Sequence, residues 1–286
     1  MKKIGLVLEG GGMRGAYTAG VLNWFLAHDV EFDYVVGISS GALYGSMFTL
    51  KKAETLEKSS VDFATDKNNV GWRPLFKEGT IVGYDHMFDT VSQNLDYPLE
   101  KLDQITEKLE IGVYDIAAEK TIWVNQHDIA KHPEYVKAAC TLPVFGKAVD
   151  IEGRKYMDGG ITTMIPLEKS IEEGCTHHVV VTTKSKDYVR KEQGFLQKHF
   201  LRFFYRKSPQ LVKDFEQRRR VYYQERALID ELVEKDEAIY LYPTQEVGVS
   251  RFGGDLEKFQ ALYKLAWNDC EAQKEKLLSF YHNVKG

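Results

Sequence analysis

Residues 34–48 have the sequence YVVGISSGALYGSMF, in which a glycine-serine turn separates two apolar runs. The first run, Tyr34-Val35-Val36, is short and apolar, which predicts a buried strand. The second run, residues 42–48, predicts the start of a helix. Between them, Gly37-Ile38-Ser39-Ser40-Gly41 has the G-x-S-x-G form of a nucleophile elbow, a sharp strand-to-helix turn that presents a serine hydroxyl.

The two glycines of this pentapeptide have a physical role. Because the turn is so tight, side chains at Gly37 and Gly41 would collide with the neighbouring strand and helix. Ser39 is therefore the candidate nucleophile, and the free N–H groups at the helix start would point at the group it attacks. The alternative is a Gly/Ser-rich turn without a ligand, and the strand–turn–helix context favours catalysis over it.

A second glycine-rich stretch lies near the amino terminus. The apolar run at residues 4–8 predicts a central parallel strand, and Gly10-Gly11-Gly12-Met13-Arg14-Gly15 follows it before a helical pattern at 16–26. A right-handed crossover would make the strands at 4–8 and 34–36 parallel neighbours.

This loop has two possible uses. Gly10, Gly12 and Gly15 satisfy G-x-G-x-x-G, so a dinucleotide-binding oxidoreductase is one alternative. That fingerprint also requires an acid at the end of the next strand, and the next strand ends in Gly37-Ile38-Ser39. Consecutive glycines can equally direct backbone N–H groups at an anion, as an oxyanion hole requires.

The third feature is Asp158-Gly159-Gly160, which follows a predicted hairpin at 148–157. It places a carboxylate at a turn where the backbone can adopt a positive φ. Taken alone, it is better explained as an ordinary Asp-Gly turn, which is common.

Composition excludes several classes of protein. A formal charge of −4 gives no overall attraction to nucleic acid. Three cysteines are too few for a disulfide framework, and no His/Cys spacing fits zinc, so we expect neither a metal nor a cofactor. No stretch has the length needed to cross a bilayer. A reduced, cytoplasmic protein is the expectation.

The remaining chain predicts a cap and a helical tail. Residues 51–109 are polar and irregular, which indicates an insertion beside the elbow, and the aromatics of 72–76 are expected to anchor it to the core rather than to line an acyl pocket. After 184 we expect a long helix from Pro209, a last strand and one terminal helix from 255 to 282. The basic and aromatic segment 195–226 is either a peripheral membrane face or an amphipathic helix pair packed on the sheet.

Together, in this order, the three motifs resemble the patatin-like phospholipase family, in particular its bacterial branch. The resemblance covers residues 4–183, with Ile38 and Ser40 where many members have Thr and Ala. It implies a three-layer α/β/α fold with a mostly parallel central sheet. Residues 1–183 would form the catalytic core, and 184–286 a helical extension packed on it within one domain.

The resemblance also implies a mechanism. Ser39 would be the nucleophile and Asp158 its general base, in a Ser–Asp dyad. The N–H groups of Gly10, Gly11 and Gly12 would form the oxyanion hole, with Arg14 fixing the loop or adding positive potential. The reaction would be phospholipase A-like hydrolysis of lipid acyl esters through an acyl-enzyme. A catalytically silent lipid-binding or scaffolding protein of the same fold is the other alternative.

Histidine, the usual partner of a catalytic serine, is not well placed in this sequence. None of the eight histidines lies in an obvious loop after a strand in the order Ser, Asp, His. His127 and His132 remain open on sequence grounds. Oligomeric state and the preferred acyl chain and headgroup are not specified by the sequence.

Overall fold

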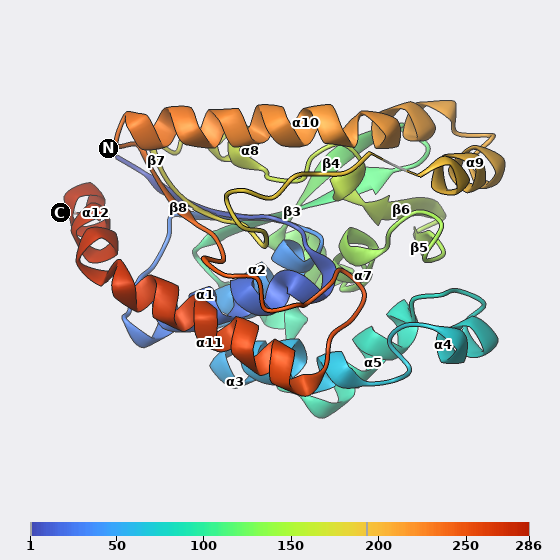
Figure 1. The fold of residues 1–286 in the computed structure, drawn as a ribbon, viewed down its shortest axis with the longest axis horizontal. Helices are drawn as coiled ribbons and strands as arrows, with labels where there is room; N and C mark the ends of the chain where they lie inside the picture. Colours follow the sequence, from blue (N-terminus) through green and yellow to red (C-terminus); the bar gives the residue numbers. More distant parts are fainter. Residues whose placement is uncertain (1, 193, 286) are drawn as a thin grey trace.

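A mixed eight-stranded sheet divides the molecule into two helical layers (Figure 1). The computed structural model describes residues 2–192 and 194–285. The strand order is β5-β6-β3-β2-β1-β7-β8, and β4 also pairs with β3. The parallel strands are β1 (Ile4–Leu8), β2 (Tyr34–Ile38), β3 (Lys108–Asp115), β7 (His177–Val181) and β8 (Ala238–Leu241). The antiparallel strands are β4 (Lys120–Asn125), β5 (Val149–Ile151) and β6 (Arg154–Asp158).

The helices differ in length between the two halves of the chain. The first half contains α1 (Ala16–Ala27), α2 (Ser40–Thr49), α3 (Ala53–Ser60), α4 (Trp72–Lys77), α5 (Tyr84–Asn94), α6 (Gln126–Lys131) and α7 (Glu134–Cys140). The second half contains α8 (Leu167–Glu172), α9 (Phe195–Phe204), α10 (Pro209–Glu234), α11 (Leu256–Ala272) and α12 (Lys274–Lys285). Short 3-10 helices are η1 (Gly12–Gly15), η2 (Phe63–Thr65), η3 (Leu99–Gln104) and η4 (Gly159–Ile161). None of the described helices has both the length and the apolar content that crossing a membrane requires.

Strand alternation explains the two layers. Ile4, Leu6 and Leu8 of β1 belong to the core cluster that contains the buried side chains of α1, α2 and α11. Val7 belongs to the opposite cluster, with side chains of α8 and α10. Because successive strand residues point to opposite faces, a strand that is apolar throughout must be covered on both sides. The three-layer fold with a mostly parallel sheet is therefore confirmed.

The carboxyl-terminal region covers both faces of this sheet. It supplies the edge strand β8, parallel to β7, while α10 packs on one face and α11 packs on α1 on the other (Figure 1). A Cβ at Gly20 of α1 would lie 2.5 Å from the Tyr263 carbonyl oxygen of α11, so the backbones of these two helices approach closely at this glycine. The single terminal helix expected from 255 to 282 is wrong: it is interrupted at Gln273, between α11 and α12.

The 51–109 segment packs against α2 and α7. The aromatic residues of 72–76, which were expected to anchor it to the core, do not do so. Trp72 and Phe76 of α4 are 76% and 85% exposed. Leu56, Val91 and Leu102 join the core instead. Helix α4 has apolar residues on its solvent side, and the anchoring is done by the helices before and after it.

Candidate active site

The serine elbow has the backbone geometry that its sequence predicts. Ser39 stands immediately before α2 with φ 54°, a conformation that side-chain-bearing residues rarely adopt. A Cβ at Gly37 would lie 2.3 Å from the Gly41 carbonyl oxygen, and one at Gly41 would lie 2.5 Å from the Leu8 carbonyl oxygen. Only glycine fits at either position, so the turn is fixed by close approach of the backbone to β1 and α2.

Two strands that meet end to end bring the acid to this elbow. Strand β4 pairs along one edge of β3. The other edge of β3 is therefore shared by β2 and β6. β2 ends with Ile38 opposite Gly112, and β6 arrives from the other direction with Asp158 opposite Val113. Ser39, which follows β2, and Asp158, which ends β6, therefore lie where the two strands stop at adjacent positions of β3.

Asp158 is buried, with 1% of its surface exposed. Its Oδ1 accepts a hydrogen bond of 2.7 Å from the Gly160 N–H group, while Oδ2 has no partner of standard hydrogen-bond geometry in the described chain. Burial raises the pKa of this carboxyl, and the Ser39 hydroxyl, the Gly160 N–H group and the charges of Arg218 and Arg251 oppose that rise. The free oxygen thus belongs to a carboxylate whose basicity is increased by desolvation.

Not every N–H group of the glycine loop is available to a ligand. The Gly10 N–H group donates to the Met164 carbonyl oxygen at 3.3 Å, and the Gly11 N–H group donates to Ser40 Oγ at 2.9 Å. In the described part of the chain, the N–H groups of Gly12 and Ser40 make no hydrogen bond. The second serine of the elbow therefore ties the loop to α2.

A buried ion pair holds the base of the same loop. Glu9 is fully buried, and its Oε2 accepts hydrogen bonds from the Thr183 N–H group at 2.7 Å and from Thr183 Oγ1 at 3.0 Å. Its other oxygen pairs with Lys184. Burial lowers the pKa of Lys184 to about 7, although the Glu9 charge opposes the shift. The loop is therefore fixed to the end of β7.

Arg14 and Arg251, which both lie near the glycine loop, line different cavities. The Arg14 guanidinium lies 5.9 Å from the centre of the Tyr188 ring and lines a small cavity beside Thr183, away from Ser39. Arg251, from the loop before α11, lines the Ser39 cavity, and its carbonyl oxygen accepts the Met13 N–H group at 3.0 Å. No sequence motif predicts the position of Arg251, because that position depends on the tertiary packing of a distant loop.

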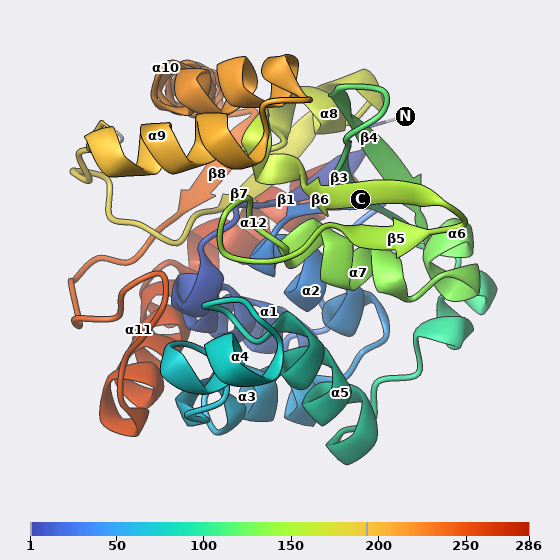
Figure 2. The ribbon, with the colours of Figure 1, turned by 90° about the vertical axis from the view of Figure 1, so that its right-hand side faces the viewer.

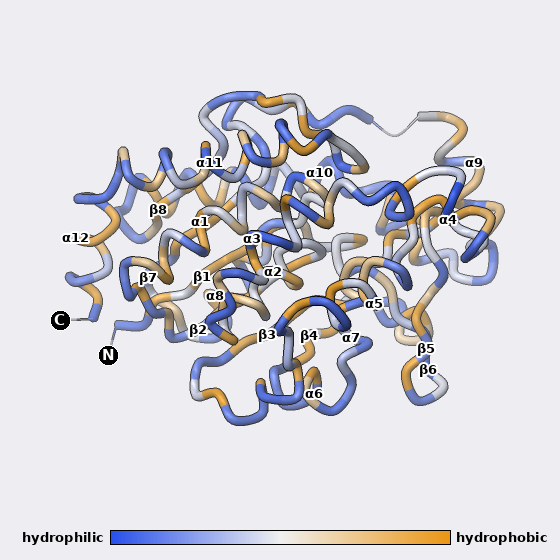
Figure 3. Tube along the Cα trace, turned by 90° about the horizontal axis from the view of Figure 1, so that it is seen from below, coloured by the Kyte–Doolittle hydropathy of each residue, from blue (hydrophilic) through white to orange (hydrophobic). Residues whose placement is uncertain are grey.

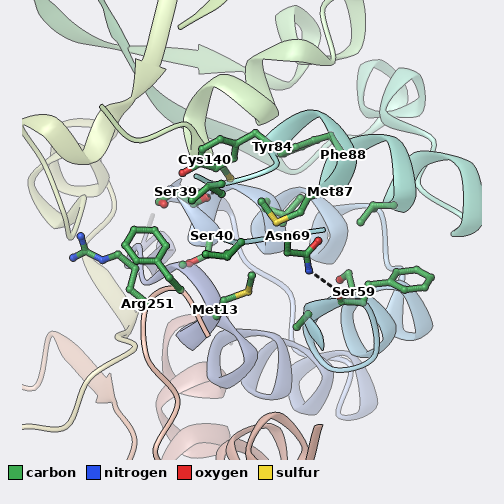
Figure 4. A pocket seen from close by; sticks show the side chains of 18 of the residues that line it. Met13, Ser39, Ser40, Ser59, Asn69, Tyr84, Met87, Phe88, Cys140 and Arg251 are labelled. Carbon is green, nitrogen blue, oxygen red and sulfur yellow. Dashed lines mark hydrogen bonds between the residues drawn. The ribbon is translucent and has the colours of Figure 1, made fainter. Parts of the chain in front are cut away.

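An apolar cavity of about 110 Å³ begins at the elbow (Figure 4). Its side chains come from the glycine loop, the elbow, the 51–109 segment and α7: they include Met13, Ser39, Leu43, Phe63, Val82, Tyr84, Met87, Phe88, Val91, Cys140 and Leu142. Cys140 also donates from Sγ to the Ser39 carbonyl oxygen at 3.3 Å. The lining suits a hydrocarbon chain, with the serine at one end.

The two histidines left open by the sequence lie elsewhere. His127 Nδ1 is 2.7 Å from Asp103 Oδ1, and His132 Nε2 is 3.4 Å from Glu152 Oε1. Among the described residues that line the Ser39 cavity, none is a histidine. The buried acid next to Ser39 is Asp158.

Helix α10 supports the acid from the other face of the sheet. Glu225 accepts the N–H groups of Met164 at 2.9 Å and Ile165 at 3.1 Å, in the segment that follows Asp158. Burial raises the pKa of Glu225 to about 8. Arg218, about two turns before Glu225 on the same face of α10, is buried as well, and its charge lowers the pKa of Asp158. The helical pattern of this region gives no sign of either contact.

Comparison with known proteins identifies the family of this chain. The family model described as patatin-like phospholipase matches residues 6–170, and a domain of unknown function (DUF6363) matches 208–282. The chain therefore belongs to the patatin-like phospholipase family. The second match covers the region that supplies Arg218, Glu225 and Arg251.

Individual relatives are distant. The chain is 26% identical over 200 residues to the uncharacterized protein YjjU of Escherichia coli, which covers 68% of this chain and 55% of that protein. It is 26% identical over 170 residues to the patatin-like phospholipase domain-containing protein ZK370.4 of Caenorhabditis elegans, covering 58% of this chain and 12% of that protein. The crystal structure of VipD from Legionella pneumophila matches with a TM-score of 0.53 and 12% identity over 99% of this chain and 67% of that chain, which shows a shared fold. The chain spans only about half, or less, of the length of these curated relatives.

Proposed function

We propose that this protein is a serine acyl hydrolase that cleaves lipid acyl esters with Ser39 as nucleophile and Asp158 as general base. The observation that supports the proposal is the meeting of β2 and β6 on β3: Ser39, which lines an apolar cavity, follows the end of β2, and the buried Asp158 ends β6 at the adjacent position of β3. A serine hydroxyl is a weak nucleophile and needs a base within reach.

In the proposed mechanism, Asp158 removes the Ser39 proton as Oγ attacks the ester carbonyl carbon. The oxyanion of the tetrahedral intermediate is held in the Gly10–Gly12 loop, where the Gly12 N–H group is not already engaged, together with the Ser40 N–H group. Asp158 then gives the proton to the departing alcohol oxygen, leaving an acyl-enzyme. Water, deprotonated by Asp158, releases the fatty acid by the same steps.

The glycine loop supports this proposal over dinucleotide binding. A Cβ at Gly10 would lie 2.7 Å from Ser39 Cβ, and one at Gly15 would lie 2.5 Å from the Tyr44 ring. The glycines that satisfy the dinucleotide fingerprint are thus needed where the loop packs against the elbow. Membership of the family gives further support.

The decisive experiment is labelling by a fluorophosphonate probe, measured by intact mass. Wild type should gain one adduct, Ser39→Ala none, and Asp158→Asn should react at least about 10²-fold more slowly, since a general base contributes about 10²–10⁴-fold. Ser92→Ala, which removes an exposed serine of α5, is the matched control and should label like wild type. An unlabelled but folded wild type would favour a catalytically silent lipid-binding protein.

We also propose that the protein contacts membranes peripherally through α9. Phe195, Phe203 and Phe204 are 82%, 57% and 62% exposed, and Lys198 and Arg202 lie on the same helix. Helix α4, with its exposed aromatics, lies at the same end of the molecule (Figures 2 and 3). Exposed aromatics interleaved with bases suit an anionic lipid surface. Of the 195–226 segment, only α9 has this character, because α10 packs on the sheet.

A further inference from the structure

A second, larger cavity lies on the side of Arg251 away from the apolar one. It has a volume of about 740 Å³ and is walled by α10, α9 and the segment 188–192. Its charged lining consists of seven basic residues, Arg190, Lys191, Lys198, Arg218, Arg219, Arg220 and Arg251, and two acidic ones, Glu192 and Glu216. Both acids are already paired, Glu192 with Arg219 at 3.3 Å and Glu216 with Arg202 at 2.7 Å.

Three guanidinium groups of this cavity have no ion-pair partner in the described part of the chain. In the described chain, the side chains of Arg190, Arg218 and Arg251 take part in no ion pair and no hydrogen bond. Arg190 and Arg218 are only 8% and 7% exposed, and Arg218 Nε is buried without a partner. Arg190 and Arg218 instead lie over aromatic rings, at 5.3 Å from the centre of Tyr222 and 4.6 Å from the centre of Phe215, and these contacts supply no hydrogen-bond acceptor to the guanidinium edges. Burying a guanidinium group without acceptors is costly, so such residues indicate a missing anion.

The three groups also repel one another. The charges of Arg251 and Arg190 add to burial in lowering the pKa of Arg218, and Arg190 does the same to Arg251. An anion between them would relieve this repulsion. Arginine's planar, forked donors match the oxygens of phosphate in pairs, and a phosphate with up to two negative charges balances three guanidinium groups better than a carboxylate does.

We infer that Arg190, Arg218 and Arg251 form a phosphate-binding site. This inference rests on the proposed hydrolase function for its biological meaning, because Arg251 lines both cavities. Figure 4 shows Arg251 at the edge of the apolar cavity that contains Ser39. A molecule with an acyl chain in the apolar cavity and a phosphate among the arginines would place its ester bond beside Ser39. The substrate class would then be a phosphate-bearing acyl ester, and the other source of the same chemistry is free phosphate.

The activity test compares two short-chain substrates that share acyl chains, a diacylglycerol phosphate and the matching diacylglycerol. The measured quantity is the kcat/KM for the diacylglycerol phosphate divided by the kcat/KM for the diacylglycerol. It is determined for wild type, Arg190→Gln and Arg251→Gln. Losing one charge-assisted contact should lower this ratio about tenfold or more, through KM. Lys264→Gln removes an equal charge from an exposed position of α11 outside the cavity wall, and its ratio should stay at the wild-type value.

The binding test does not depend on turnover. The melting temperature is followed during titration with inorganic phosphate and with glycerol 3-phosphate, against chloride at equal ionic strength. Wild type should be stabilised by a few degrees at saturation, and both variants of the site much less.

The outcomes separate the sources. Stabilisation by phosphate with a lowered substrate ratio supports a lipid headgroup site. Stabilisation by phosphate with an unchanged substrate ratio overturns the proposal that the site binds a lipid headgroup, and assigns the site to free phosphate. An unchanged ratio without stabilisation overturns the inference. If wild type hydrolyses neither substrate, the proposed hydrolase function fails, and the titration still decides whether phosphate binds.

Discussion

Asp158 is a carboxylate in a position where an imidazole is more usual, and its environment determines how good a base it is. An ordinary aspartate has a pKa of about 4 and holds a proton weakly. Burial raises the pKa of Asp158, while Arg218 and Arg251 limit the rise. The same two arginines that face the second cavity therefore also adjust the proposed base.

This balance predicts the pH dependence of hydrolysis. Asp158 must be ionised to accept a proton, so kcat/KM for a neutral ester should fall as pH drops through its raised pKa, at a pH above about 4. Arg251→Gln removes a charge that lowers this pKa, so the acid limb should move to higher pH. The pH–rate profiles of the two proteins measure it, and a limb that stays in place or moves down would contradict the assignment.

Glu225 predicts a second effect of ionisation, on stability. The pKa of Glu225 in the folded protein is raised to about 8, so folding favours its protonated form. The resulting contribution to the free energy of unfolding is fully present below about pH 4.5 and is lost as the pH rises through about 8. The free energy of unfolding in urea should therefore decrease over that range more steeply for wild type than for Glu225→Gln. Parallel curves for the two proteins would show that Glu225 does not titrate in this way.

At the scale of single elements, α10 is the helix that connects residues 184–286 to the proposed catalytic pair. It presents Glu225 to the backbone after Asp158, and the charge of Arg218 lowers the pKa of the Asp158 carboxyl. Glu225→Ala would leave two buried N–H groups unsatisfied, each costing about 1–3 kcal/mol. We expect a clearly lower melting temperature together with slower fluorophosphonate labelling, and Glu225→Gln should lose less of both because it retains an acceptor.

Helix α9 carries the prediction about membranes. Phe203→Ser with Phe204→Ser should weaken binding to anionic vesicles about tenfold or more, since burying each aromatic side chain contributes about 1.5–3 kcal/mol. Ile171→Ser on α8, which removes an exposed apolar residue near the start of β7 at the other end of the sheet, is the control. Vesicle co-sedimentation measures both, and equal losses would exclude a specific role for α9.

At the scale of the whole molecule, the two matched family regions form a single structure. Residues 184–286 supply the strand β8, the helix α11 that packs on α1, and Arg251, which lines the Ser39 cavity. A chain ending at residue 183 would expose β7 and the face of α1 that packs on α11. We predict that it is insoluble or unfolded and does not label, whereas a folded, labelled fragment would show that the core is independent.

The sequence is most informative where function depends on local backbone shape. The elbow, the glycine loop and the Asp158 turn are each set by glycines within a few residues, and the long helix from Pro209 to Glu234 was predicted from its own pattern. Arg251 could not be predicted, because a loop 212 residues from the elbow has no local signal for where it docks. The exposure of Trp72 was missed for the same reason, since burial is decided by partners and not by residue type.

The end-to-end meeting of β2 and β6 has a consequence for heat inactivation. The β5–β6 hairpin forms the edge of the sheet, and β6 holds β3 through only three residues, 113–115. Edge elements with few contacts open before the rest of a protein unfolds. Fraying of this hairpin would separate acid from serine while every other strand stays paired. Loss of labelling on heating should therefore precede global melting, and amide hydrogens of β6 should exchange before those of β1.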